Sequence, residues 1–215
     1  MQKKTYAVLG LGRYGTAVAK ELVKSGMEVI AVDKNEQIVQ DSSVYLPICK
    51  CADITDPEVI SELGISNADV VIVAMASSLE GSILAITLCK EAGVKTVIAK
   101  CANETHRKIL KRVGADTVVF PENESGTRLA KNLLTSGFTD VLTLSDDLSL
   151  VELTARDEWV GKSLKELNLR KKYTVNVVAF RKNGKITAPV NPEELLDKDT
   201  EIIAIVNPAK LSKLK

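Results

Sequence analysis

Histidine and aromatic residues are scarce in this chain. Its 215 residues include one histidine, one tryptophan, three phenylalanines and four tyrosines. The histidine, His106, stands in the polar segment Glu104–Arg107, where a solvated side chain is expected, so an imidazole for catalysis is scarcely available. The low aromatic content also argues against a surface on which nucleic-acid bases stack.

The chain also lacks an excess of either charge and a long apolar run. Its 29 Lys and Arg residues are balanced by 28 Asp and Glu residues, so no overall field favours nucleic acid as a partner. The longest apolar stretch, around Val70–Ala76, is much shorter than the roughly 20 residues that span a bilayer. Met1 leads directly into a strand-like segment without an apolar leader. We therefore expect a cytosolic protein.

Cysteine is sparse as well. Cys49, Cys51, Cys89 and Cys101 lie in or beside apolar segments and form neither a CxxC pair nor a His/Cys cluster. The pattern favours small, reduced core residues over a metal or redox site. Cys49 and Cys51 are expected to share one face of a strand.

A glycine-rich motif is the most informative feature that the sequence does contain. Gly10-Leu-Gly-Arg-Tyr-Gly15 follows the apolar run Thr5–Leu9 and opens a segment of helical spacing. A second apolar run, Glu28–Asp33, then ends in an acidic residue. This order of strand, glycine turn, helix and acid-terminated strand is typical of a Rossmann nucleotide-binding unit.

Each residue of the motif suits a part of a nucleotide. Gly10 permits a tight turn, Gly12 lets the backbone approach phosphate, and Gly15 lets the helix pack close to the sheet. Asp33 can accept hydrogen bonds from both ribose hydroxyls, and its charge disfavours the 2′-phosphate of NADP. Arg13 places a cation with forked donors beside the phosphates, which makes ATP a candidate beside NAD(H). The alternative is a Rossmann-like turn that binds nothing, with a solvated Arg13.

The residues that follow predict a doubly wound parallel sheet of six strand–helix repeats. The expected strands are Thr5–Leu9, Glu28–Asp33, Leu46–Cys51, Ala68–Ala74, Thr96–Ala99 and Thr117–Phe120. A capping box from Thr55 to Glu58 is expected to start the helix after the third strand. Asp53, at the carboxyl end of that strand, suits either an adenine amino group or a helix cap.

A helix is predicted after the sixth strand, beginning at Pro121 and running to Gly137. Glu122 and Glu124 complement its dipole, although two carboxylates at a sheet end could instead hold a hard cation. The character of the chain changes after this helix. We therefore predict a nucleotide-binding domain over residues 1–137, which includes a crossover helix, and a small α+β domain over residues 138–215.

The second predicted domain has shorter elements. Strands are expected at Leu150–Ala155, Thr174–Phe180 and Glu201–Val206, with a hairpin turn at Asn183-Gly184. Asn168–Tyr173 is predicted to be a basic loop, which suits either an anionic ligand or partner, or simple solvation.

Together these residues resemble a known family, the RCK (regulator of potassium conductance) or KTN subunits, which form the cytosolic ring of Ktr and Trk potassium transporters. The resemblance covers nearly the whole chain. The segments that carry it are Ala7–Gly15, Val32-Asp33, Asp53 with Thr55, Gly114–Asp116, Phe120–Glu122, Gly161–Leu164 and Leu167–Arg170. The chain departs from the family at Ala52, where the family often has glycine before the aspartate.

The resemblance implies roles for particular residues. The residues implied to bind the phosphates of a nucleotide are Gly10, Gly12, Arg13 and Gly15. Asp33 would hold the ribose, and Asp53 would lie near the adenine. Lys100 would lie on the nucleotide-facing edge of the sheet. Arg13 would face the terminal phosphate of ATP, and Glu122 would bind a divalent cation, Mg or Ca, at a dimer interface. Leu164, Asn168, Leu169 and Arg170 look like the motif with which some Ktr subunits bind cyclic di-AMP.

The function that follows from the resemblance is regulatory and not enzymatic. The resemblance implies a homo-oligomer in which dimers assemble into an octameric ring. The ring would switch an integral-membrane potassium-conducting subunit in response to ATP or ADP and to cyclic di-AMP. Through that partner, the cytoplasmic chain would lie at the inner face of the membrane. An NAD(H)-responsive Trk-type subunit is the alternative. A small NAD-dependent dehydrogenase is a weaker one, because no His or Lys acid/base is evident beside a nicotinamide.

Overall fold

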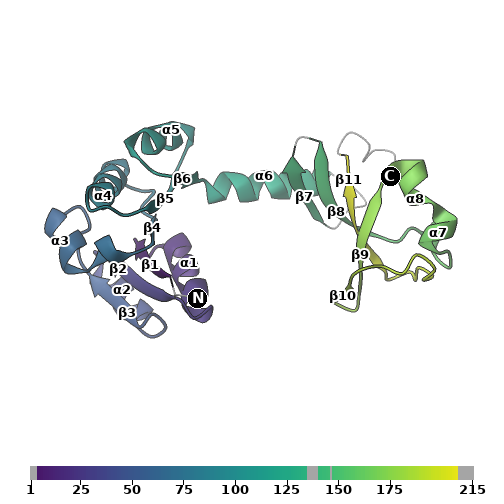
Figure 1. The fold of residues 1–215 in the computed structure, drawn as a ribbon, viewed down its shortest axis with the longest axis horizontal. Coiled ribbons are helices and arrows are strands. Elements are labelled where there is room, and N and C mark those ends of the chain that lie inside the picture. Colours follow the sequence, from purple (N-terminus) through teal and green to yellow (C-terminus); the bar gives the residue numbers. More distant parts are fainter. Residues whose placement is uncertain (1–3, 135–139, 146, 208–215) are drawn as a thin grey trace. The chain divides into compact units, whose positions relative to one another are not determined.

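The computed structural model describes residues 4–134, 140–145 and 147–207 (Figure 1). Contacts within the chain divide it into two units, Met1–Pro121 and Glu122–Lys215. The domain boundary expected between residues 137 and 138 lies outside the described residues. No helix among the described residues is long and apolar enough to cross a membrane.

The first unit is a parallel sheet with helices. Its strands are β1 (Thr5–Leu9), β2 (Glu28–Asp33), β3 (Ile48–Cys51), β4 (Val70–Val73), β5 (Thr96–Lys100) and β6 (Thr117–Val119). Its helices are α1 (Arg13–Lys24), α2 (Glu36–Ser42), α3 (Pro57–Glu62), α4 (Leu79–Glu91) and α5 (Glu104–Val113), with a 3₁₀ turn, η1 (Ile65–Asn67). The strand order is β3-β2-β1-β4-β5-β6, which confirms the predicted doubly wound fold.

The apolar strands of this sheet supply core residues to both of its faces. Along β4, Val71 and Val73 belong to one buried cluster and Ile72 belongs to another. The first cluster includes Ala85 of α4 and the second includes Ala19 of α1. Successive side chains of a strand point to opposite faces, so a strand covered by helices on both sides must be apolar throughout.

Side-chain hydrogen bonds cap several helices of the first unit, and one of these caps differs from the predicted residue. Asn35 caps α2 and Asn103 caps α5 through their side-chain oxygens. The expected capping box from Thr55 is wrong, because Asp56 is the N-cap of α3 and accepts the Glu58 N–H at 3.0 Å. Pro57 occupies the first helical position, so the residue immediately before it becomes the cap.

The cysteines are free thiols, but they do not all lie in the core. Cys89 and Cys101 are buried, Cys49 is half-buried and Cys51 is exposed. The prediction of four core cysteines is therefore wrong for Cys51. The reason is sheet topology, since β3 lies at the edge of the sheet and the sequence alone does not reveal that position.

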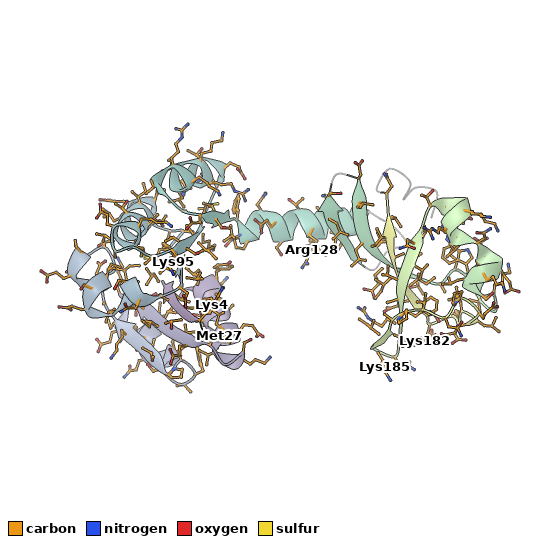
Figure 2. All side chains as sticks on the ribbon, in the orientation of Figure 1. Lys4, Met27, Lys95, Arg128, Lys182 and Lys185 are labelled. Atoms are coloured by element: carbon orange, nitrogen blue, oxygen red, sulfur yellow. The ribbon has the colours of Figure 1, made fainter. Side chains whose placement is uncertain are left out.

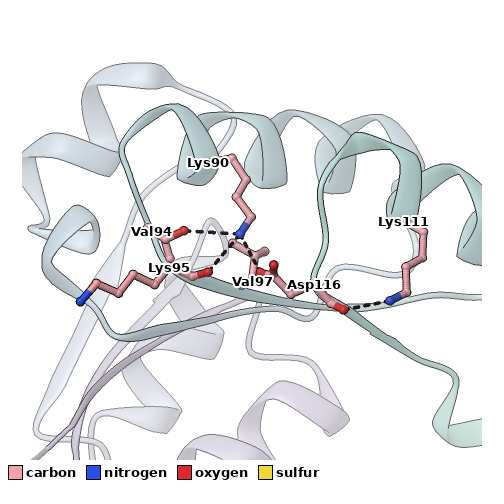
Figure 3. A network of polar contacts seen from close by, with 6 residues as sticks. All are labelled: Lys90, Val94, Lys95, Val97, Lys111 and Asp116. Carbon is pink, nitrogen blue, oxygen red and sulfur yellow. Dashed lines mark hydrogen bonds and ion pairs between the residues drawn. The ribbon is translucent and has the colours of Figure 1, made fainter.

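One ion pair and several hydrogen bonds connect helices α4 and α5 with strands β5 and β6, at the end of the sheet where these two strands begin. The Lys90 ammonium, near the end of α4, donates to Asp116 and to the carbonyls of Val94 and Lys95 (Figure 3). Lys111 of α5 donates to the Asp116 carbonyl at 2.8 Å. These contacts hold the ends of two helices against the starts of two strands.

The second unit is an antiparallel sheet with one longer helix, α6, and two short ones. Its strands, in the order β10-β9-β11-β8-β7, are β7 (Asp140–Ser145), β8 (Leu148–Thr154), β9 (Asn176–Lys182), β10 (Lys185–Thr187) and β11 (Glu201–Val206). Its helices are α6 (Pro121–Leu134), α7 (Leu164–Leu167) and α8 (Leu169–Tyr173), with a 3₁₀ turn, η2 (Asp157–Trp159). The α+β class expected for this part of the chain is confirmed.

Local conformation in the second unit explains one success and one error of prediction. Asn183 and Gly184 have φ angles of 49° and 75°, which confirms the hairpin turn between β9 and β10. Lys182 and Lys185 flank that turn (Figure 2). The basic loop expected at Asn168–Tyr173 is instead helix α8, because Asn168 adopts the left-handed conformation that ends α7 and lets a second helix start.

Candidate nucleotide-binding site

A cavity of about 510 Å³ lies in the first unit where strands β1 to β4 end. Strand β1 pairs with β2 on one side and with β4 on the other, so the strand order reverses at this point. Ligands of open α/β sheets bind in the crevice at such a reversal. The residues that line the cavity are Gly10, Gly12, Val32, Asp33, Lys34, Ile38, Ala52, Asp53, Ile54, Thr55, Ala74, Met75, Ser77, Ser78, Glu80, Gly81 and Leu84.

The glycine turn after β1 can be built only with glycine at two positions. Gly10 has a φ angle of +96°, and a Cβ there would lie 2.8 Å from Cγ of Met75. A Cβ on Gly15 would lie 1.9 Å from the carbonyl oxygen of Gly10, so this glycine lets helix α1 pack against the turn. A Cβ on Gly12 would meet no atom within 4 Å, so the protein itself does not require glycine there.

Helix α1 begins at Arg13, and its N-cap, Gly12, offers no side-chain hydrogen bond. The N–H groups of the first turn therefore lack a side-chain acceptor at the cap, which suits an anionic ligand. The Arg13 side chain is exposed, and Arg13 is not among the residues that line the cavity. Gly15 is also outside the lining, because it is buried under the turn.

Asp33 connects the end of β2 with the glycine turn. One carboxylate oxygen accepts the Leu11 N–H at 2.7 Å, and the other accepts the Asn35 N–H at 2.8 Å. The side chain is half-buried and lines the cavity. Each carboxylate oxygen has a second lone pair, so these bonds leave acceptor capacity for ribose hydroxyls.

Asp53 lines the cavity from the end of β3. One of its oxygens accepts both the N–H and the hydroxyl of Thr55, at 3.0 and 2.7 Å. These two bonds, chiefly that from the Thr55 hydroxyl, lower the pKa of the Asp53 carboxyl, so the side chain is a carboxylate at neutral pH. Helix α3 is capped by Asp56 and not by Asp53. The alternative role of Asp53 as a helix cap is therefore wrong.

One wall of the cavity was missed by the sequence analysis. Met75, Ser77, Ser78 and Glu80 lie after β4 and at the start of α4, and all four line the cavity. They carry no motif, so only the position of β4 beside β1 could have identified them. The sequence predicted a doubly wound sheet but no strand order, so it could not place the loop after β4 at the switch point that faces the ligand crevice.

Two further residues named from the sequence are not among those that line this cavity. Lys100 ends β5, and its ammonium nitrogen is 5.7 Å from the centre of the Tyr14 ring. Glu122 is exposed in the first turn of α6, within the second unit. Within the described part of the chain, no group of three or more His, Cys, Asp or Glu residues could hold a metal ion.

The residues expected for a second ligand lie on α7 and α8. Leu169 is buried and Leu164 is half-buried against the core of the second unit. Asn168, between the two helices, and Arg170 are exposed. The segment therefore combines an apolar anchor with an amide and a guanidinium that are open to solvent, which is a chemistry suited to an anionic ligand.

The architecture defines a class: a Rossmann-type domain with a crevice at its switch point, followed by a small antiparallel α+β domain. Residues 6–121 match the TrkA-N domain and residues 148–215 match the TrkA-C domain. The chain is 35% identical to Ktr system potassium uptake protein C of Bacillus subtilis (strain 168) over 213 residues, which cover 99% of this chain and 96% of that protein. It is 34% identical to Ktr system potassium uptake protein A of Vibrio alginolyticus over 213 residues, covering 99% and 97% of the two chains.

A solved structure, the GsuK channel bound to NAD, shares the fold with a TM-score of 0.67 at 17% sequence identity. The match covers 99% of this chain and 39% of that one. The chain thus belongs to the family with TrkA-N and TrkA-C domains, the RCK regulatory subunits of Ktr and Trk potassium uptake systems. The two Ktr relatives are named as potassium uptake proteins, which agrees with the expected regulatory role.

Proposed function

We propose that this chain is the gating subunit of a potassium uptake transporter and that an adenine nucleotide in the first unit sets its state. The observation that carries the proposal is the cavity at the switch point, where the glycine turn faces Asp33 and Asp53. Its volume of about 510 Å³ suits a nucleotide-sized ligand. Gly12 supports the phosphate end, because the space beside it is open to a close approach.

Arg13 is proposed to distinguish ATP from ADP. It is exposed at the first residue of α1, so its guanidinium can reach a phosphate that extends past the cavity. A ligand shifts a conformational equilibrium only through its different affinities for the two states. ATP and ADP must therefore bind different geometries unequally, and the extra phosphate is the only group that differs.

NAD(H) is the competing ligand for the same cavity. Asp33 suits the ribose of either nucleotide, and the GsuK channel shares this fold and is bound to NAD. An NAD(H)-responsive, Trk-type subunit would use the same glycine turn. The two possibilities differ in the role of Arg13, because a dinucleotide has no terminal phosphate for it to bind.

A divalent cation, Mg or Ca, is proposed to accompany ATP with Glu122 as a ligand. Glu122 is an exposed carboxylate in the first turn of α6, a hard oxygen donor of the type these ions prefer. The proposed assembly is a homo-oligomer in which dimers form an octameric ring. This ring would act on an integral-membrane potassium-conducting subunit, which keeps the chain at the cytoplasmic face of the membrane.

Cyclic di-AMP is proposed as a second input, at Leu164, Asn168, Leu169 and Arg170. The support is chemical: Arg170 offers a forked cation to phosphate, and Asn168 offers amide donors and acceptors to a base. The buried Leu169 anchors the start of α8 and lies between Asn168 and Arg170 in the chain.

Calorimetric titration of the nucleotide-stripped protein tests these proposals. ATP, ADP, NADH and cyclic di-AMP are titrated in turn, with and without Mg²⁺ or Ca²⁺. We expect ATP and ADP to compete for one site, the cation to affect ATP alone, and cyclic di-AMP to bind independently. Tight NADH binding with negligible ATP affinity would instead identify the Trk-type alternative.

A further inference from the structure

The backbone of Leu11, in the centre of the glycine turn, is held from two sides. Its N–H donates to Asp33 at 2.7 Å, and its carbonyl accepts the Thr16 hydroxyl at 2.7 Å. The neighbouring Gly10 N–H donates to the Val32 carbonyl at 2.8 Å. The turn is thus tied by the protein's own hydrogen bonds to the end of β2 and to the first turn of α1.

We infer that Thr16 and Asp33 together are positioning residues that fix the phosphate-binding turn before any ligand arrives. A peptide group is planar and trans, so directing the Leu11 carbonyl toward Thr16 turns the Gly12 N–H to the opposite side. Gly12 lines the cavity, whereas Thr16 does not. Thr16 therefore acts on the ligand through the backbone and not by contact.

We call the two hydrogen bonds from Thr16 and Asp33 to the Leu11 backbone the Thr16–Asp33 clamp. Asp33 then has a second role beside the expected contact with the ribose. A flexible, glycine-containing turn loses conformational entropy when it closes on phosphate, and this loss weakens binding. Hydrogen bonds that hold the turn in the free protein remove part of that loss. The inference rests on the proposed function, because it concerns affinity for the phosphates of the nucleotide.

The decisive variant is Thr16→Val, which removes the hydroxyl, keeps the shape of the side chain and alters no residue that lines the cavity. Loss of one hydrogen bond corresponds to roughly 3- to 10-fold in affinity. We expect that loss for ATP and for inorganic tripolyphosphate, and no change for adenosine. Thr16→Ser retains the hydroxyl and is expected to restore the affinity. Thr87→Val is the matched control, because the Thr87 hydroxyl also donates to a backbone carbonyl, that of Ile83, at 2.9 Å, and Thr87 does not line the cavity.

A second arm tests Asp33 without its ribose contact. Tripolyphosphate has no ribose, and loss of a negative charge alone would favour this polyanion. A lower affinity in Asp33→Ala, which removes both acceptor oxygens, would therefore show that Asp33 acts on the turn. In the ligand-free protein, Thr16→Val is expected to speed amide exchange at Leu11 and Gly12. Equal ATP affinities of the wild type and Thr16→Val would overturn the inference alone, whereas a wild-type chain that binds no nucleotide would overturn the proposed function and this inference with it.

Discussion

The ammonium nitrogen of Lys90 lies 2.6 Å from a carboxylate oxygen of Asp116, although the two residues are 26 positions apart. The same oxygen accepts the Val97 N–H at 2.6 Å (Figure 3). One carboxylate therefore connects the end of helix α4 with the first residues of strand β5. The Lys90 hydrogen bond is the main cause of the lowered pKa of Asp116.

We expect Asp116→Asn to lower the free energy of unfolding by about 1 kcal/mol at neutral pH, because a neutral amide forms a weaker hydrogen bond and no ion pair with the ammonium group. The magnitude is at the low end for a charged bond, since 44% of the Asp116 side chain is exposed. Urea denaturation measures the change, and Asp41→Asn on the exposed surface of α2 is the control. The effects of Lys90→Met and Asp116→Asn should be less than additive, because both remove the Lys90–Asp116 ion pair, while Lys90→Met also removes the bonds to the Val94 and Lys95 carbonyls.

The pH dependence of that difference is a separate prediction. A carboxyl whose pKa is lowered on folding stabilises the protein above the pKa of the unfolded chain, near 3.8, and this contribution is lost as pH falls through the folded pKa. The difference between wild type and Asp116→Asn should be constant above about pH 5 and should shrink below about pH 4. A difference that stays constant down to acid unfolding would assign the effect to packing and not to charge.

Two glycine substitutions at the start of α1 should have different consequences. Gly15→Ala forces a Cβ to 1.9 Å from a backbone oxygen, so we expect a loss of roughly 1–3 kcal/mol in stability. Gly12→Ala meets no atom within 4 Å, so its melting temperature should match the wild type while its nucleotide affinity falls. Thermal melts and calorimetry on both variants provide the comparison, and unchanged ATP binding by Gly12→Ala would contradict a phosphate beside Gly12.

Arg13→Gln should reduce ATP affinity more than ADP affinity. One exposed charge-assisted contact with the terminal phosphate corresponds to about a fivefold change in the ATP/ADP ratio. Lys24→Gln, at the other end of α1, is the control because it removes a cation that is far along the helix. An unchanged ratio for Arg13→Gln would show that another residue distinguishes the two nucleotides.

Arg170→Gln should weaken cyclic di-AMP binding by about tenfold and leave ATP binding unchanged. The substitution removes the forked cation but keeps a polar side chain at an exposed position of α8. Lys185→Gln on strand β10 removes an equal charge from the same unit and serves as the control (Figure 2). Equal losses in the two variants would indicate a general effect of charge and not a site at α8.

Much of the first unit was determined by the sequence. Apolar runs such as Val70–Val73, punctuated by glycine, asparagine and serine at helix ends, specify alternating strands and helices. The glycine motif and Asp33, which ends β2, identified in advance three residues that line the cavity, Gly10, Gly12 and Asp33. Asp33 and Asp53 could be named in advance because parallel strands bring their carboxyl ends to one edge.

Tertiary structure alone decided the rest. The wall formed by Met75 and Glu80 exists because β4 lies beside β1, and no local pattern encodes that neighbour. Cys51 is exposed because β3 is an edge strand, and α8 forms because Asn168 adopts a left-handed conformation. The hydrogen bonds of Thr16 and Asp33 to Leu11 also depend on how the turn closes. Sequence periodicity fixes which face of an element is apolar, whereas contacts between residues distant in the chain require the completed packing.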